Sequence, residues 1–218
     1  MSRSGIALGL LMLLAACASG PPPPDWQMNA KASLERATQA YLSGDSRVEA
    51  AEFARARLEL ARTGRADLLA RAELTRCAAR VASLEFDDCP AFAALAQDAQ
   101  PAERAYANYL AAKATAVDLG LLPAAQRETP AAIADPLSRL VAAGVLLRSG
   151  RADPALYALA ADTASAQGWR RPLLAWLQLQ AQRADAAPDA ELAARLRRRI
   201  ELVLNAAGRQ HSGQASEC

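Results

Sequence analysis

The sequence predicts an all-α protein, a right-handed solenoid of helical hairpins, with a closed helical bundle as the alternative. Alanine, the strongest helix former, makes up roughly a quarter of the 218 residues, and aromatic residues only 5%. The β-branched and aromatic residues that favour strands are scarce. Apolar residues recur at helical spacing in segments of about 15–20 residues, many of which begin at proline or end at glycine.

The first 16 residues have the composition of an export leader. Arg3 provides a positive charge, residues 6–14 form an apolar run, and Ala15 and Ala16 are the small residues expected before a cleavage site. A transmembrane helix needs about 20 apolar residues, so this run is too short to be one. We therefore expect the leader to be removed during export.

The stretch Leu14-Ala15-Ala16-Cys17 resembles the lipobox of bacterial lipoproteins. The resemblance implies that Cys17 becomes the first residue of the mature protein and carries the acyl chains that anchor it. The next residue is not the aspartate that signals inner-membrane retention in enteric bacteria, which favours the periplasmic face of the outer membrane. Residues 17–25, with four consecutive prolines, are expected to form an extended stalk. An ordinary signal peptide followed by an incidental cysteine is the alternative.

Three helices are expected between the stalk and residue 85. The first covers residues 26–42, and the third covers residues 67–84 with leucine and alanine at helical spacing. The second opens at Ser46, whose spacing from Glu49 is that of a capping box, and continues to residue 63. All three are followed or preceded by short polar loops, so neighbouring helices should be antiparallel.

Three cysteines remain after Cys17. An exported protein meets oxidising conditions, so a disulfide is permitted. Cys77 lies about two turns before a helix end, and residues 85–89 can fold back that far, so we expect a bond to Cys89 worth about 2–3 kcal/mol. Two buried thiols are the alternative, and a metal site lacks nearby histidines. Cys218 is left over in the polar tail, residues 209–218.

The later helices begin with proline in the first turn, where its missing N–H costs no hydrogen bond. Asp135 and Asp153 each precede such a proline and have the position of an N-cap. The helical domain is thus expected to span residues 26–208. Its later helices are expected over residues 101–118, 136–149, 154–168, 173–184 and 188–207.

Two loops in this domain match each other, Arg62-Thr-Gly-Arg-Ala-Asp67 and Arg148-Ser-Gly-Arg-Ala-Asp153. Each precedes a helix rich in leucine and alanine. This arrangement resembles tetratricopeptide-like helical hairpins, and residues 40–45 resemble the Tyr and Gly region of that motif's first helix. The strict period of about 34 residues is missing. The resemblance therefore implies a degenerate helical-hairpin solenoid and leaves the closed bundle open.

No catalytic, cofactor or metal motif stands out in the sequence. The single histidine, His211, lies in the polar tail, where neither a nucleophile pair nor a zinc ligand set is within easy reach. A glycine-rich phosphate loop is absent. The net charge of +2 is too small to indicate a nucleic-acid partner. We therefore expect a protein that is not an enzyme and needs no cofactor.

Aromatic and basic side chains are the candidates for binding a partner. On the concave face of a solenoid, aromatic residues would be anchors, although at helical spacing they more often belong to the core. Arginines in the last helix suit an anionic surface, such as lipid head groups or an acidic protein, although a solvated face is the simpler interpretation. The candidates are Tyr106, Tyr109, Tyr157, Trp169, Trp176, Arg195, Arg197, Arg198 and Arg199.

These observations predict an outer-membrane-anchored periplasmic lipoprotein that binds an envelope protein as an adaptor or assembly factor. Its contact with the membrane would be the N-terminal lipid. An envelope enzyme or enzyme subunit acting on peptidoglycan or polysaccharide, with an unrecognised active site, is the alternative.

Overall fold

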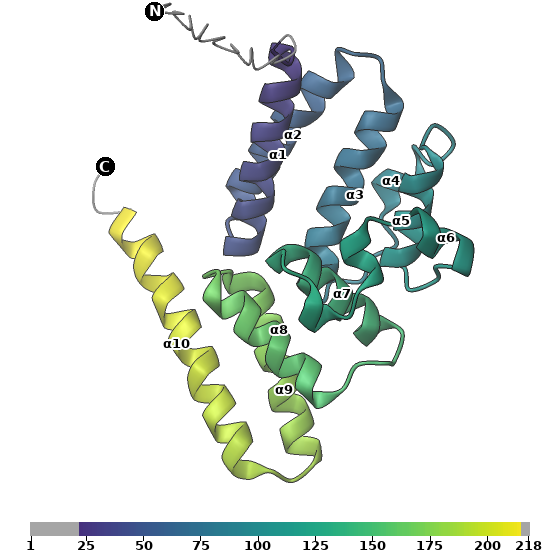
Figure 1. Ribbon diagram of the computed structural model, residues 1–218. Coiled ribbons are helices and arrows are strands. Elements are labelled where there is room, and N and C mark those ends of the chain that lie inside the picture. The colour runs from purple at the N-terminus through teal and green to yellow at the C-terminus, as the bar shows by residue number, and fades with distance from the viewer. Residues whose placement is uncertain (1–21, 215–218) are drawn as a thin grey trace, which may run out of the picture.

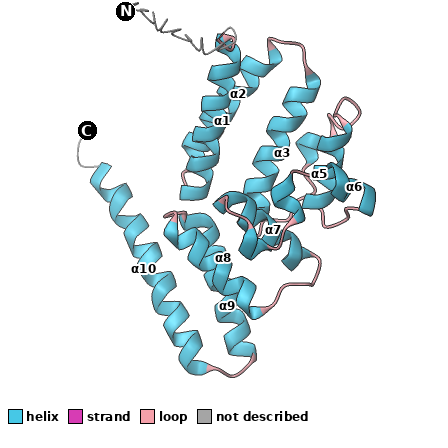
Figure 2. Cartoon of the chain, in the orientation of Figure 1, coloured by secondary structure: helices cyan, strands magenta, loops and turns pink. Residues whose placement is uncertain are grey.

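A computed structural model describes residues 22–214 (Figure 1). Within this range the chain is helical, with ten α-helices, two short 3₁₀ helices and no strand (Figure 2), so the all-α prediction is confirmed. The leader, Cys17 and Cys218 lie outside the described residues. Among the described helices, none has the length and apolar composition that crossing a bilayer requires.

The N-terminal half is a stack of helices joined by short turns. Its elements are α1 (Asp25–Ser43), α2 (Ser46–Ala61), α3 (Ala66–Ala82), the single turn α4 (Pro90–Ala93), α5 (Pro101–Leu110) and α6 (Ala116–Leu121). α1 and α2 form an antiparallel hairpin, α3 packs against both, and α5 packs against α3 (Figure 1). Neighbours in the sequence are therefore neighbours in space.

The start of α2 differs from the prediction. Asp45, not Ser46, is the N-cap, and its carboxylate accepts a hydrogen bond from the Val48 N–H at 3.0 Å. Gly44 ends α1 in the left-handed conformation, with φ 87°. This turn places an aspartate, which caps as well as serine, one residue earlier than the predicted box.

The single helix expected over residues 101–118 is two helices. α5 ends at Leu110, and α6 starts again after Thr115. Thr115 and Asp118 form a capping box, in which the Asp118 N–H donates to the Thr115 hydroxyl at 3.2 Å and the Thr115 N–H donates to the Asp118 carboxylate at 2.8 Å. Each residue thus accepts a hydrogen bond from the backbone N–H of the other. Because these N–H groups would otherwise lack a partner, the box stabilises the start of a new helix here.

The C-terminal half follows two 3₁₀ turns, η1 (Ala124–Arg127) and η2 (Pro130–Ala132), with α7 (Pro136–Arg148), α8 (Pro154–Ala166), α9 (Arg170–Ala186) and α10 (Ala190–Gln214). The two predicted aspartate caps are confirmed. Asp135 accepts from the Ser138 N–H and Asp153 from the Leu156 N–H, each at 2.7 Å. The last helix is longer than expected, because α10 continues past residue 207.

The main core runs from the end of α1 through α3, α7, α8 and α9 to α10. At its centre α7 crosses α3, and Gly144 makes this crossing close. A Cβ on Gly144 would collide with the carbonyl oxygen of Val81, so the two helix backbones touch there. Trp176, fully buried, fills the space beside the end of α3.

The start of α9 packs against the end of α1, 130 residues earlier in the sequence. The Trp169 indole N–H donates to Gln39 Oε1 at 3.1 Å, and Arg171 Nε donates to the Tyr41 carbonyl at 2.8 Å. The Arg171 guanidinium also lies 4.4 Å from the centre of the Tyr41 ring. In a solenoid each repeat contacts its neighbours only. The solenoid therefore stays a prediction, and this contact is one that a closed bundle would make.

Candidate functional site

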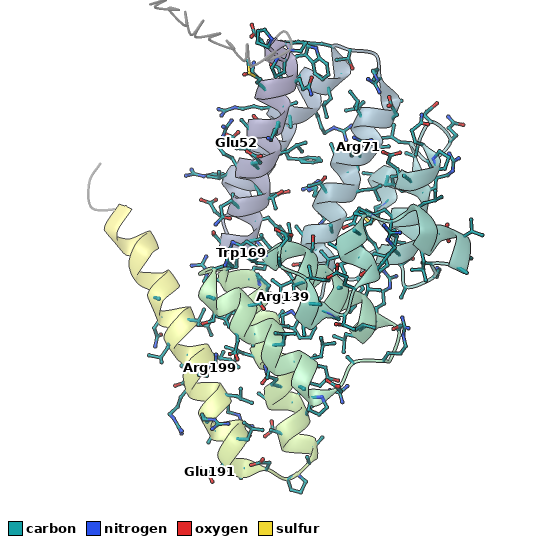
Figure 3. The ribbon with its side chains drawn as sticks, in the orientation of Figure 1. Glu52, Arg71, Arg139, Trp169, Glu191 and Arg199 are labelled. Carbon is teal, nitrogen blue, oxygen red and sulfur yellow. A yellow bond between two sulfur atoms is a disulfide. The ribbon has the colours of Figure 1, made fainter. Side chains whose placement is uncertain are left out.

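A groove of about 690 Å³ runs between α1 and α3. Its floor is apolar, with Leu34 of α1 and Leu68 of α3 among the side chains that form it. Trp26, at the start of α1, lies at one end. Trp169 lies at the other end, beside the end of α1 (Figure 3). The α1/α3 groove therefore follows α1 from Trp26 to Leu42, a length of about 24 Å at 1.5 Å per residue.

Charged side chains on the rim of the α1/α3 groove are paired. On α1, Lys31 and Glu35 lie one turn apart, with Nζ 3.8 Å from the carboxylate. On α3, Arg71 donates to Glu103 Oε1 from Nε at 3.0 Å and from Nη2 at 2.6 Å. Because these charges are balanced, the apolar floor is the feature that distinguishes the groove from the surrounding surface.

Buried glutamates fix the helices that form the groove. Each accepts from, or lies in an ion pair with, an arginine of another helix, and the arginine extends toward solvent. A buried carboxylate is tolerated only with such a partner, so these pairs hold the helices in register. The pairs are Glu52 with Arg36, Glu49 with Arg76, Glu73 with Arg57 and Glu103 with Arg71.

Glu52 shows the electrostatic effect of this pairing (Figure 3). Arg36 donates to one of its oxygens at 2.9 Å, and Arg55 donates to the other at 2.6 Å. The hydrogen bond from Arg36 is the main reason that the pKa of Glu52 lies below its ordinary value. Glu52 is thus held as a carboxylate between α1 and α2.

A second hollow, of about 480 Å³, lies between α3 and α5, and Arg71 and Thr75 line both it and the α1/α3 groove. Tyr106, predicted as a partner anchor, lines this α3/α5 hollow, and burial raises the pKa of its hydroxyl well above its ordinary range. Glu103 Oε2 and Gln126 Oε1, from residues in the same wall, are buried with no hydrogen-bond partner among the described residues. The two hollows therefore adjoin across α3.

The other predicted aromatic anchors divide between core and groove. Tyr109, Tyr157 and Trp176 are buried in the core, which corrects their assignment to a partner surface. Burial raises the pKa of Tyr109 to about 12. Trp169 is also mostly buried, but it contributes to the end wall of the groove. The helical spacing of these residues predicted helical segments. It could not predict which face of each helix packs against the core.

The predicted arginines lie on α10, away from the groove (Figure 3). Arg197 Nη2 lies 2.7 and 2.8 Å from the two carboxylate oxygens of Asp185, and Arg199 lies 3.9 Å from Asp162. Arg195 and Arg198 are exposed. The structure therefore does not bring the aromatic and basic candidates together in one site.

Cys77 and Cys89 lie at disulfide distance, as predicted, with their Cα atoms 5.9 Å apart. The link joins α3 to the start of α4. Asp87 stands close enough to the two sulfurs to form a three-ligand cluster. Its carboxylate, however, accepts from Arg80 at 2.6 Å and from the Cys89 N–H at 3.2 Å. This arrangement is that of a cross-link braced by an ion pair.

Apart from Trp169, the residues that line the groove were not predicted as a site from the sequence. Leu34 and Leu68 have the spacing of ordinary core positions, and their sequence surroundings carry no signal that they remain open. Comparisons with protein-family models, with curated proteins and with solved structures find no match for the chain.

Proposed function

We propose that the protein is a lipid-anchored lipoprotein of the outer membrane that binds a partner protein in the periplasm, as an adaptor or assembly factor. The α1/α3 groove carries the partner-binding part of this proposal. Its volume of about 690 Å³ lies within the range of about 300–1,000 Å³ for ligand-binding sites. An open, apolar, elongated groove suits a helix better than a compact ligand.

The partner element is an amphipathic helix laid along α1. In this recognition mode, apolar side chains at i, i+3, i+4 and i+7 enter a hydrophobic groove. Leu34 and Leu68 offer the apolar contacts, while Lys31, Glu35 and Arg71 offer polar contacts at the edges. The buried ion pairs that link α1 to α2 and α2 to α3 hold the two walls through α2 and keep the groove preformed, which lowers the entropy cost of binding.

Anchoring rests on the lipobox resemblance at residues 14–17. The Cys17→Ser variant is expected to be released from membranes or to remain unprocessed. A variant that fractionates and migrates like the wild type would contradict the anchor. The helix-binding proposal would stand in that case, because the groove belongs to the folded domain.

Site-specific photocrosslinking tests the groove. A photoreactive amino acid at Lys31 should crosslink to a partner in cells, and one at Leu58, exposed on α2, should not. Adding Leu68→Gln should abolish the crosslink, whereas Arg47→Gln should leave it unchanged. The crosslinked partner peptide should have amphipathic helical spacing. Equal crosslinking from both positions would exclude the groove as the binding site.

A further inference from the structure

The α3/α5 hollow contains two buried oxygens that the fold leaves without a donor. They are Glu103 Oε2, on α5, and Gln126 Oε1, on η1, and both side chains are more than nine-tenths buried. Neither oxygen has a hydrogen-bond partner among the described residues, although both residues line the hollow. Most buried polar groups in proteins are paired, because an unpaired one costs free energy. Two unpaired acceptors in the lining of one hollow therefore indicate a donor group that is recognised there.

The negative charge of Glu103 is buried, while the charge that balances it is in solvent. Arg71 donates to Oε1 alone, and its side chain is 66% exposed, against 7% for Glu103. Water therefore screens the guanidinium charge more than the carboxylate charge. No other described residue of the lining is charged. Arg127 and Asp135, which are next to lining residues in the sequence, are both exposed and opposite in sign, so they leave this balance unchanged.

The rest of the lining suits the apolar body of a small molecule. Leu74 of α3, the ring of Tyr106 on α5 and Leu121 at the end of α6 contribute apolar surface. The volume of about 480 Å³ lies within the range of about 300–1,000 Å³ for small-molecule sites. The hollow thus combines apolar walls with a small number of polar atoms, as such sites do.

We propose that the α3/α5 hollow binds a small organic molecule with a primary ammonium group on an apolar body. The two unpaired atoms are acceptors, so the ligand has to donate. An ammonium has three N–H donors, enough for both oxygens, whereas a hydroxyl has one. Its bond to the Glu103 carboxylate is charge-assisted and therefore among the stronger hydrogen bonds. The apolar body would lie against Leu74 and Tyr106.

The wall formed by α6 and η1 is the part of the hollow that can admit this ligand. No residue of α6 is buried, and the principal contacts of this helix are with α5. Gln126 follows on η1, a single 3₁₀ turn. Because both unpaired oxygens are buried, the ammonium reaches them only when this segment moves, and binding should then hold it in one position. Hydrogen exchange of residues 119–128 should therefore slow when the ligand is bound.

Titration calorimetry with 2-phenylethylamine tests this inference on the full-length Cys17→Ser chain, which carries no lipid into which the amine could partition. The amine should bind. 2-Phenylethanol, with the same ring and one neutral donor, should bind at least about tenfold more weakly, and phenylacetate, which offers acceptors only, should not bind. Glu103→Gln should lower the affinity for the amine about tenfold, and Gln126→Leu about fivefold, because a bond to a charged acceptor contributes more than one to an amide.

The stability of Gln126→Leu separates a binding role from a structural one. Leucine replaces an amide whose oxygen is buried without a donor, so the urea midpoint of this variant should be unchanged or higher while its affinity falls. Matched controls are Glu191→Gln on α10 and Gln178→Leu on α9, both exposed. Glu191 lies at the opposite end of the molecule from Arg71 (Figure 3). Both control variants should bind the amine like the parent chain.

Four outcomes would overturn the inference. Absence of binding, or equal binding of phenylacetate, would show that the hollow does not recognise a donor. Unchanged affinity in both Glu103→Gln and Gln126→Leu would exclude the two oxygens as the acceptors. A lower urea midpoint for Gln126→Leu would assign this residue a structural role. Exchange that slows along α1 and not at residues 119–128 would place the amine in the other hollow. None of these outcomes contradicts helix binding in the α1/α3 groove.

Discussion

The Trp176 indole nitrogen donates a hydrogen bond to the Ala82 carbonyl oxygen at 3.1 Å, in the buried core. Ala82 is the last residue of α3. Its carbonyl is therefore one of the groups at a helix end that receive no hydrogen bond from within the helix. The tryptophan of α9 thus caps α3 from the side. This bond links the two halves of the protein at the point where a buried carbonyl needs a donor.

Trp176→Phe should separate this hydrogen bond from the packing of the ring. The smaller ring leaves the Ala82 carbonyl buried without its donor, and we expect a loss of about 1–3 kcal/mol in the free energy of unfolding. Trp176→Ala adds a cavity, for a total of about 3–5 kcal/mol. Urea unfolding measures both. Equal losses for the two variants would contradict the contribution of ring volume, and no loss in Trp176→Phe would contradict that of the hydrogen bond.

Gly144→Ala should destabilise the α3–α7 crossing. The new methyl group meets the backbone of Val81, which cannot move without shifting α3, so a loss of about 1–3 kcal/mol is expected. Gly120→Ala, in α6, is the control, because a Cβ there meets no atom within 4 Å. Alanine should be neutral or stabilising at that position. A stabilising Gly144→Ala would contradict the close crossing.

Arg57→Met should leave the buried Glu73, 2% exposed, without its ion-pair partner between α2 and α3. We expect a loss of about 3 kcal/mol in the free energy of unfolding. The double variant Arg57→Met/Glu73→Met should recover most of it, because both charges are then removed. Arg62→Met is the control, since its partner Glu59 lies in an exposed pair of one helix. No recovery in the double variant would contradict this account.

Alkaline pH should destabilise the protein through Tyr109. Its pKa is raised by burial to about 12, from an ordinary value near 10, so the folded state holds the proton more tightly. The contribution of Tyr109 to the free energy of unfolding is fully present below about pH 10 and is lost between about pH 10 and 12. At pH 11 the loss should be about 1 kcal/mol. Tyr109→Phe should reduce the difference in unfolding free energy between pH 9 and 11, and an unchanged difference would exclude Tyr109 as its source.

Breaking the Cys77–Cys89 link should lower stability without removing the helices. A cross-link that closes a loop of this size restricts the unfolded chain and so stabilises the folded protein by about 2–3 kcal/mol. We expect Cys77→Ala/Cys89→Ala to unfold at lower urea with an unchanged far-ultraviolet circular dichroism spectrum in buffer. Reductant should shift the wild type to the same midpoint and leave the double variant unaffected. Finding both cysteines as free thiols in protein purified from cells would rule out the link.

The sequence predicted best what depends on a few adjacent residues. Asp135 and Asp153 cap as expected, because an aspartate followed by proline specifies a helix start by itself. The failures are also local. Asp45 takes the cap from Ser46, and Thr115 with Asp118 restarts a helix that apolar spacing alone would have continued. At the first position two residues could each serve as the N-cap. At the second, a capping box competed with continued apolar spacing. The sequence alone does not decide either case, because the outcome depends on where the backbone turns.

The candidate site depends on contacts that the sequence does not encode locally. Trp169 reaches the groove because α9 meets the end of α1, and Leu34 lines it while packing only partly against the neighbouring core. Tyr106 faces a hollow while Tyr109, one turn further along, is in the core. Those differences come from the placement of whole helices. Apolar periodicity therefore predicts the helices and does not predict the candidate site.

The contact between α1 and α9 also sets an order of events during synthesis. The chain emerges from its N-terminus, so α1, α2 and α3 are present long before Trp169 can close the end of the groove. Contacts of such long sequence separation form late, because a large loop must be closed first. A nascent or truncated chain that lacks residue 169 would present a groove with one end open. The complete groove is thus a property of the finished chain, and the proposed partner would distinguish finished from unfinished molecules if it contacts the end wall.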